Sequence, residues 1–217
     1  MRFGRRRTRS SRDYGREGRS SGGTVSGATA EAEEPFQKKI EKIHDVAYRC
    51  KDAKETVNWY VNNLNMDFVL AIAENQVPST HEPDPYKHVF LDAGDGNVLA
   101  FFELPTKPEM DRDPNTPRWV QHIAFKVKDR DTLLAFKDKL EKSGVDVLGV
   151  TDHSIFHSIY FFDPNGHRIE LACPDPKEEA MLERLDAVKW EMLEEWSKTK
   201  RAPKHAEWMH AEELSKA

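Results

Sequence analysis

A nine-residue segment occurs twice in this sequence. His44–Asp52 reads HDVAYRCKD and Gln121–Asp129 reads QHIAFKVKD. Apolar and polar residues alternate along both copies, which is typical of half-buried β-strands. Each copy leads into a segment with apolar residues at helical spacing and then into further strand-like segments. Because the order of elements repeats with the sequence, the simplest interpretation is two copies of one βαβββ unit.

Residues typical of helix N-termini predict one helix in each unit. Asp52 with Glu55 resembles a capping box, and Asp131 is predicted to cap the second helix, which Gly144 ends. The predicted strands are 43–50, 68–72, 88–92 and 98–104 in the first unit, and 119–127, 145–150, 158–162 and 167–173 in the second. The predicted fold class is therefore α+β, with two paired βαβββ units forming a cupped mixed sheet.

The segments on either side of the repeat have a different character. Residues 1–37 are rich in Arg, Ser and Gly, and we expect disorder there because few apolar side chains offset the entropy of ordering. A targeting peptide and an arm that contacts nucleic acid are the alternatives. Residues 38–174 form the predicted domain. Residues 175–217 form a predicted helical extension, with Asp175 as N-cap and an apolar stripe that packs on the domain or on a second subunit.

Composition argues against several functions. The first 20 residues carry eight Arg, whereas the whole chain has a net charge of −5, so the remainder is acidic and unsuited to nucleic acid. The longest apolar runs fall far below the ~18 residues of a spanning helix. Two cysteines are too few for a disulfide framework. We expect a cytoplasmic protein with a small-molecule substrate and no membrane partner, and a homodimer is possible.

Strand parity identifies candidate functional residues, because alternate side chains share one face of a strand. The polar faces and strand ends of the two units carry Asp45, Arg49, Glu103, His122, Lys126 and Glu170. If the two units face each other, three carboxylates and one imidazole meet, and they repel one another unless a cation lies between them. A divalent metal site on Asp45, Glu103, His122 and Glu170 is therefore predicted. The alternative is four unrelated polar strand ends that face water.

Two basic residues share the polar faces with these groups. Arg49 and Lys126 are predicted to bind an anionic substrate or the oxygens of a metal-bound one. The alternative is that these two side chains pair with the carboxylates on the wall of the concavity.

Residues 40–173 resemble the vicinal oxygen chelate superfamily, which includes glyoxalase I, extradiol ring-cleaving dioxygenases and bleomycin- or fosfomycin-resistance proteins. The resemblance implies a cupped sheet that holds a metal on His122, Glu170 and Glu103. The first-strand ligand of the family is normally His and sometimes Gln, whereas the repeat places Asp45 there. His44 lies one residue away and reaches the same face only through a β-bulge. Asp45 is the preferred candidate and His44 the alternative.

A second segment resembles the extradiol dioxygenase signature. It comprises Thr151–His153, five further residues, and Ile159–Glu170 with the turn D-P-N-G. The resemblance implies Glu170 as an iron ligand, His153 as an acid/base and Tyr160 as a hydrogen-bond donor to substrate or oxygen. The alternatives are a core aromatic at Tyr160 and an exposed loop histidine at His153.

Counting ligands separates the candidate reactions. An octahedral ion that binds a catecholate through two oxygens and also O₂ needs three open positions, whereas a glyoxalase-type isomerase tolerates four protein ligands. In a three-ligand site on Asp45, His122 and Glu170, a second carboxylate stands in place of a neutral histidine and makes the site more negative. Such a site favours Fe(II) or Mn(II) over zinc. The predicted function is a metal-dependent extradiol-type ring-cleaving dioxygenase acting on a catechol-like small molecule. The alternatives are a glyoxalase I-like lyase or isomerase and a non-catalytic small-molecule-binding protein.

Overall fold

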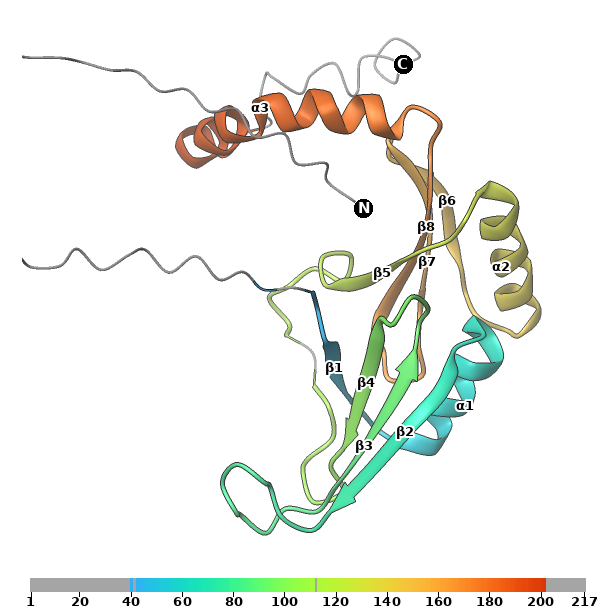
Figure 1. Cartoon of the computed structure of the whole chain (residues 1–217), viewed down its shortest axis with the longest axis vertical. Helices are drawn as coiled ribbons and strands as arrows, with labels where there is room; N and C mark the ends of the chain where they lie inside the picture. Colours follow the sequence, from blue (N-terminus) through green and yellow to red (C-terminus); the bar gives the residue numbers. More distant parts are fainter. Residues whose placement is uncertain (1–39, 41, 112, 202–217) are drawn as a thin grey trace, which may run out of the picture. The chain divides into compact units, whose positions relative to one another are not determined.

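The computed structural model describes residues 40, 42–111 and 113–201. The chain divides into two units, residues 1–41 and residues 42–217. The predicted disordered segment 1–37 lies outside the described residues, as do residues 202–217 of the predicted helical extension. The second unit contains two four-stranded mixed sheets, with strand orders β1-β4-β3-β2 and β5-β8-β7-β6 (Figure 1). The α+β fold of two paired βαβββ units is thus confirmed.

Each sheet belongs to one module of consecutive elements. The first module comprises β1 (Asp45–Cys50), α1 (Ala53–Leu64), β2 (Asp67–Glu74), β3 (Tyr86–Asp92) and β4 (Val98–Glu103). The second comprises β5 (His122–Lys126), α2 (Arg130–Lys142), β6 (Leu148–Asp152), β7 (Phe156–Phe162) and β8 (Arg168–Pro174). β1 pairs with β4, and β5 with β8, in parallel, whereas the other pairs are antiparallel. β5 begins later than predicted because residues 117–120 form a turn, in which Val120 N donates to Pro117 O.

The two module helices begin in the same way. Asp52 caps α1 as predicted, and its carboxylate accepts from Glu55 N at 2.8 Å. The predicted cap of the second helix is wrong by two residues: Asp129 accepts from Thr132 N at 2.9 Å, and Asp131 lies in the first turn of α2. Asp129 occupies the position in the second repeat that Asp52 occupies in the first. An acidic side chain such as Asp131 is favourable in a first turn, where the helix dipole is positive.

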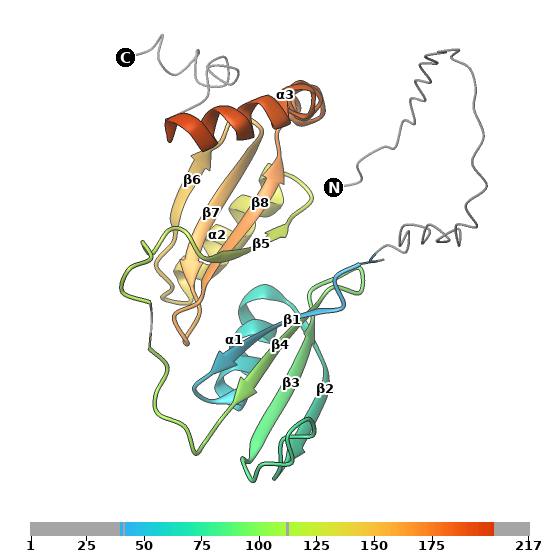
Figure 2. The ribbon, with the colours of Figure 1, turned by 90° about the vertical axis from the view of Figure 1, so that its left-hand side faces the viewer.

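α3 (Glu178–Thr199) follows β8 and lies across the ends of β6, β7 and β8 (Figure 2). Lys177, not Asp175, is the N-cap residue, and Asp175 instead accepts from Lys177 N at 2.8 Å in the preceding turn. In the predicted apolar stripe, Met181, Leu185, Val188 and Met192 are half-buried, whereas the last member, Trp196, is 47% exposed. Trp190, outside the stripe, is 66% exposed. In the described part of the chain, no helix combines the length and the apolar character that crossing a membrane requires.

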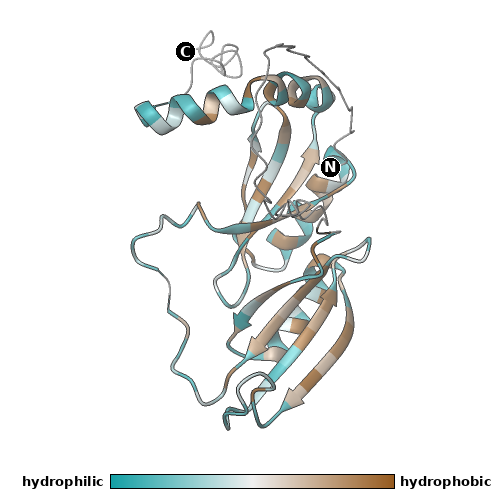
Figure 3. Cartoon of the chain, turned by 60° about the vertical axis from the view of Figure 1, so that its left-hand side comes forward, coloured by the Kyte–Doolittle hydropathy of each residue, from teal (hydrophilic) through white to brown (hydrophobic). Residues whose placement is uncertain are grey.

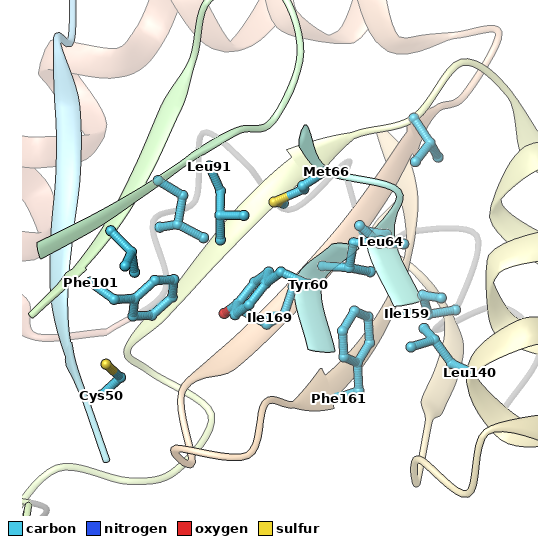
Figure 4. Packing of buried hydrophobic residues seen from close by; sticks show 14 of the residues in the cluster. Cys50, Tyr60, Leu64, Met66, Leu91, Phe101, Leu140, Ile159, Phe161 and Ile169 are labelled. Carbon is cyan, nitrogen blue, oxygen red and sulfur yellow. The ribbon is translucent and has the colours of Figure 1, made fainter. Parts of the chain in front are cut away.

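The two modules share one hydrophobic core. Apolar residues are concentrated in the strands, and much of the segment between β4 and β5 is polar (Figure 3). Tyr60 of α1, which is fully buried, lies between Phe101 of the first module and Ile169 and Phe161 of the second (Figure 4). The rings of Tyr60 and Phe101 are 5.1 Å apart. Neither module therefore buries its apolar face without the other.

The D-P-N-G turn between β7 and β8 joins the modules through polar contacts. Asp163, 5% exposed, accepts from the backbone of Asn165 and His167 and from the Tyr60 hydroxyl at 3.1 Å. Asn165 Oδ1 accepts from Lys51 N at 2.8 Å, and His167 Nε2 donates to Arg49 O at 2.7 Å. The turn therefore fixes β1 and α1 against the second sheet.

Replacing Tyr60 with phenylalanine tests this contact between the modules. We expect the free energy of unfolding to fall by about 1–2 kcal/mol, because a buried carboxylate oxygen loses a donor while the apolar ring stays. The measurement is urea denaturation followed by circular dichroism. Tyr86→Phe is the control, since no hydrogen bond of the Tyr86 hydroxyl occurs among the described residues. Equal losses in the two variants would contradict a role for the Tyr60 hydroxyl.

Candidate metal centre

β5 and β8 bring together His122 and Glu170. The parallel register pairs His122 with Arg168 and Ala124 with Glu170, so the two side chains are diagonal neighbours on one face of the sheet. His122 Nε2 lies 2.9 Å from Glu170 Oε2. The Glu170 side chain is 5% exposed and the His122 side chain 31%. This face therefore holds a buried carboxylate in direct contact with an imidazole.

The hydrogen bond of His122 Nδ1 indicates what Nε2 of the same ring can bind. His122 Nδ1 lies 2.9 Å from Val120 O, and a proton on Nδ1 donates to this carbonyl. Neutral His122 then directs the Nε2 lone pair at a carboxylate oxygen, and two such acceptors attract each other only through a proton or a cation. Two adjacent ligands of an octahedral ion, each bound at about 2.1 Å, are about 3 Å apart. The pair therefore fits a divalent metal.

Neighbouring hydroxyls orient the Glu170 carboxylate. Ser158 Oγ and Tyr160 Oη both donate to Glu170 Oε1, the latter at 3.0 Å, so Oε2 is left for His122. Tyr160 Oη also contacts His153 Nε2 at 2.8 Å. Burial, and then the negative charge of Glu170, raises the pKa of Tyr160, so its hydroxyl keeps the proton that it donates. Tyr160 thus connects His153 to the carboxylate.

Glu103 does not occupy the position equivalent to Glu170. Ala47 pairs with Ala100 in the first module as Ala124 pairs with Glu170 in the second, so Ala100 is the structural counterpart of Glu170. The similar triplets Phe102–Leu104 (FEL) and Ile169–Leu171 (IEL) predict that Glu103 and Glu170 are equivalent. This prediction is wrong, because a match of three residues does not fix the register of a strand. Glu103 pairs with Cys50, and its Oε2 accepts from Ala53 N at 2.8 Å, at the start of α1.

Asp45 lies where the repeat predicts it, at the first position of β1, as His122 does in β5. His44 precedes the strand and hydrogen-bonds to Asp45; their side chains are 92% and 30% exposed. In the parts of the chain that the structure describes, no three His, Cys, Asp or Glu side chains lie close enough to one another to hold a metal ion. Of the four predicted ligands, the structure therefore brings together His122 and Glu170.

The two predicted substrate-binding residues lie apart. Arg49 donates from Nη2 to Pro108 O, on the segment between the modules. Lys126 is exposed at the end of β5 and borders a cavity of about 520 Å³. Neither pairs with the predicted carboxylate ligands among the described residues.

Two residues near the site were missed by sequence analysis. Ser158 precedes Tyr160 by two positions and contacts Glu170. Arg168 precedes Glu170 by two positions, and its guanidinium lies 4.0 Å from the centre of the Tyr160 ring. Strand parity contained the signal for both residues, since each shares the face of a predicted site residue.

Two βαβββ modules with a His–Glu pair on the strands of one cupped sheet define the glyoxalase-like class of proteins. Residues 42–171 match the family model of the Glyoxalase/Bleomycin resistance protein/Dioxygenase superfamily, and the chain belongs to this superfamily. The predicted resemblance is thus confirmed. The superfamily contains metal-dependent enzymes, among them glyoxalases and dioxygenases.

Two curated relatives match parts of the chain. The putative ring-cleaving dioxygenase MhqA of Bacillus subtilis is 27% identical over 88 residues, which cover 41% of this chain and 28% of MhqA. The metallothiol transferase FosB of Shouchella clausii is 34% identical over 98 residues, which cover 40% of this chain and 66% of FosB. The chain thus spans less than two thirds of either relative.

A solved structure shares the fold. It is a glyoxylase/bleomycin resistance protein/dioxygenase domain from Frankia sp. EAN1pec, with a TM-score of 0.51 and 15% identity. The match covers 63% of this chain and all of that domain.

Proposed function

We propose that this chain is a metal-dependent, extradiol-type ring-cleaving dioxygenase that acts on a catechol-like small molecule and uses Fe(II) or Mn(II). The observation that carries the proposal is the series of contacts from His153 through Tyr160 and Glu170 to His122. It joins a candidate proton acceptor to a candidate metal ligand in the segment that resembles the extradiol signature. The similarity to MhqA, named as a putative ring-cleaving dioxygenase, supports the same reaction.

The number of protein ligands favours ring cleavage over isomerisation. Ala100 supplies no ligand at the counterpart of Glu170, and Glu103 contacts the backbone of α1. The proposed ligands are then His122, Glu170 and one group from the first strand, which is Asp45 or, alternatively, His44. Three protein ligands leave three positions of an octahedral ion for two substrate oxygens and O₂. A four-ligand site of the glyoxalase type lacks its fourth donor here.

We further propose that the first-strand ligand comes from a second copy of the chain. His122 and Glu170 have no third ligand near them among the described residues. β1 and β5 are both edge strands, so each module presents its ligand-bearing strand where another copy can approach it. β2 also exposes a run of large apolar side chains that a second copy would cover: Phe68, Val69, Leu70 and Ile72, which are 38–57% exposed.

In this proposal the protein groups orient and move protons. When bound, the metal ion supplies Lewis acidity and a template for the two substrate oxygens. Val120 O fixes the His122 ring, and Ser158 and Tyr160 fix the Glu170 carboxylate. Because Tyr160 donates its proton to Glu170, His153 Nε2–H donates to the Tyr160 oxygen. The lone pair of neutral His153 is then on Nδ1, which can accept a proton from a substrate hydroxyl.

Oxygen uptake tests the proposed reaction. The full chain is purified without oxygen, loaded with Fe(II) or Mn(II), and mixed with a panel of catechols in an oxygen electrode, with ring-opened products identified by mass spectrometry. The proposal predicts stoichiometric metal and one O₂ consumed per ring opened. Metal-loaded protein that consumes no oxygen across the panel would contradict it. Conversion of methylglyoxal hemithioacetal would favour the isomerase instead, and binding of catechols without turnover a binding protein.

Replacing His153 with glutamine separates proton transfer from metal binding. The glutamine amide still donates to Tyr160 but accepts no proton at neutral pH, so we expect turnover to fall by about 10²–10⁴-fold. The affinity for Mn(II), measured by calorimetry, should stay within about threefold, because Glu170 keeps its hydroxyl partners. An unchanged turnover would remove His153 from the reaction. His157→Gln is the matched control, since His157 lies on the same hairpin beside Asp152 and Asp175.

A further inference from the structure

Arg168 is a positively charged residue beside the His–Glu pair. It pairs with His122 across the parallel strands, and its guanidinium lies over the Tyr160 ring. A guanidinium has five N–H donors, and one hydrogen bond of Arg168 occurs in the described chain, from Nη1 to Trp119 O. No ion pair of Arg168 occurs among the described residues. Most of the Arg168 N–H donors thus have no hydrogen-bond partner within the part of the chain that the structure describes.

A cavity of about 240 Å³ connects Arg168 to the candidate metal ligand. Arg168 and His122 both line it, and Phe162 and Tyr48 add aromatic walls. A cavity of about 150 Å³ accommodates benzene, so this space suits a single substituted ring. A ring held here has an imidazole and a guanidinium as neighbours.

The walls of the cavity differ in charge. The segment between the modules contributes Asp111 and Asp113, whereas the strand β8 contributes Arg168. Hydrogen bonds from Thr116 and from the Asn115 backbone lower the pKa of Asp113, so this carboxyl stays ionised at neutral pH. An anionic substituent is repelled by the two aspartates and attracted by the arginine. The charges therefore favour one orientation of an acidic ligand.

We infer that Arg168 makes this site selective for aromatic substrates that carry a carboxylate, which its guanidinium binds in the cavity beside His122. The inference rests on the proposed function for the ring and its hydroxyls, and on Arg168 alone for the acid group. Arginine matches a carboxylate through two parallel N–H···O bonds. Arg168 is then a specificity residue.

Equilibrium binding separates this selectivity from the reaction. Calorimetry on the anaerobic Mn(II)-loaded full chain compares catechol with 3,4-dihydroxybenzoate, and phenol with benzoate. We expect the wild-type chain to bind each acid more tightly than its uncharged counterpart. Arg168→Gln should lower the affinity for 3,4-dihydroxybenzoate about 10–100-fold and the affinity for catechol less than about threefold. Arg168→Lys, which keeps the charge without the fork, should retain part of the preference.

Arg118→Gln is the matched control, because the Arg118 guanidinium also lies over an aromatic ring, that of Phe162, but does not line the cavity. We expect it to leave the acid preference unchanged. Equal binding of acids and uncharged counterparts by the wild-type chain, or an acid preference that survives in Arg168→Gln, would overturn the inference. An Arg168-dependent preference for benzoate in a protein that cleaves no catechol would uphold the inference and refute the proposed reaction.

Discussion

Replacing Glu170 with glutamine should abolish oxygen uptake and lower the affinity for Mn(II) by at least about 100-fold. Loss of a group that merely supports a ligand commonly costs 10–100-fold, and loss of the ligand itself costs more. The substitution preserves shape and still accepts from Ser158 and Tyr160, but it removes the charge that faces His122. Titration calorimetry with Mn(II) measures the affinity.

Glu103→Gln is the matched control for this substitution. Both glutamates are the middle residues of similar triplets, FEL at 102–104 and IEL at 169–171, but Glu103 accepts from the first backbone N–H of α1. We expect its replacement to cost about 1 kcal/mol of unfolding free energy and to leave metal affinity unchanged. If Glu103→Gln weakened Mn(II) binding as much as Glu170→Gln, the three-ligand site would be wrong and a fourth carboxylate would have to be restored.

Mixing two inactive variants should restore activity if the site forms between two copies. Asp45→Ala removes the proposed first-strand ligand and Glu170→Gln the second-module ligand, so each homodimer lacks both sites. A mixed dimer has one intact site. Random exchange after equal mixing should therefore return about a quarter of wild-type activity. Oxygen uptake after co-refolding or co-expression measures it, with analytical ultracentrifugation to verify the dimer.

Two further mixtures sharpen the complementation test. His122→Ala mixed with Glu170→Gln should remain inactive, because both lesions lie in one module and no pairing yields an intact site. His44→Ala should leave activity nearly unchanged if Asp45 is the ligand, and should replace Asp45→Ala in the test if His44 is. A monomeric protein that binds one Mn(II) per chain would contradict a shared site.

Most of the fold could be predicted because local sequence patterns, repeated in both units, specify the strands and the helix starts. Strand alternation located β1 and β5, and the Asp52 side chain begins α1 where the sequence predicts it. The second cap was misplaced because Asp129 and Asp131 are both suitable residues, and only the backbone shows that Asp129 is extended. The repeat itself favours Asp129 as the cap, because Asp129 is the counterpart of Asp52.

Only those features of the site that depend on the alternation of side chains within a strand could be predicted. His122 and Glu170 share a face by parity, and the structure places them in contact. The register of β4 could not be predicted, since it depends on the length of the β3–β4 turn and on pairing with β1. That register, not the local triplet, puts Ala100 opposite Ala47 and carries Glu103 to the start of α1. Contacts across the modules, such as Tyr60 with Asp163, also have no local signal.

In the proposed site, His122 and Glu170 hold one divalent ion. Anomalous diffraction at the manganese edge, on crystals of the full chain soaked in Mn(II), tests it most directly. We expect a single strong peak per chain, about 2.0–2.3 Å from both His122 Nε2 and Glu170 Oε2. A peak that contacts neither atom, or no peak at saturating Mn(II), would contradict it.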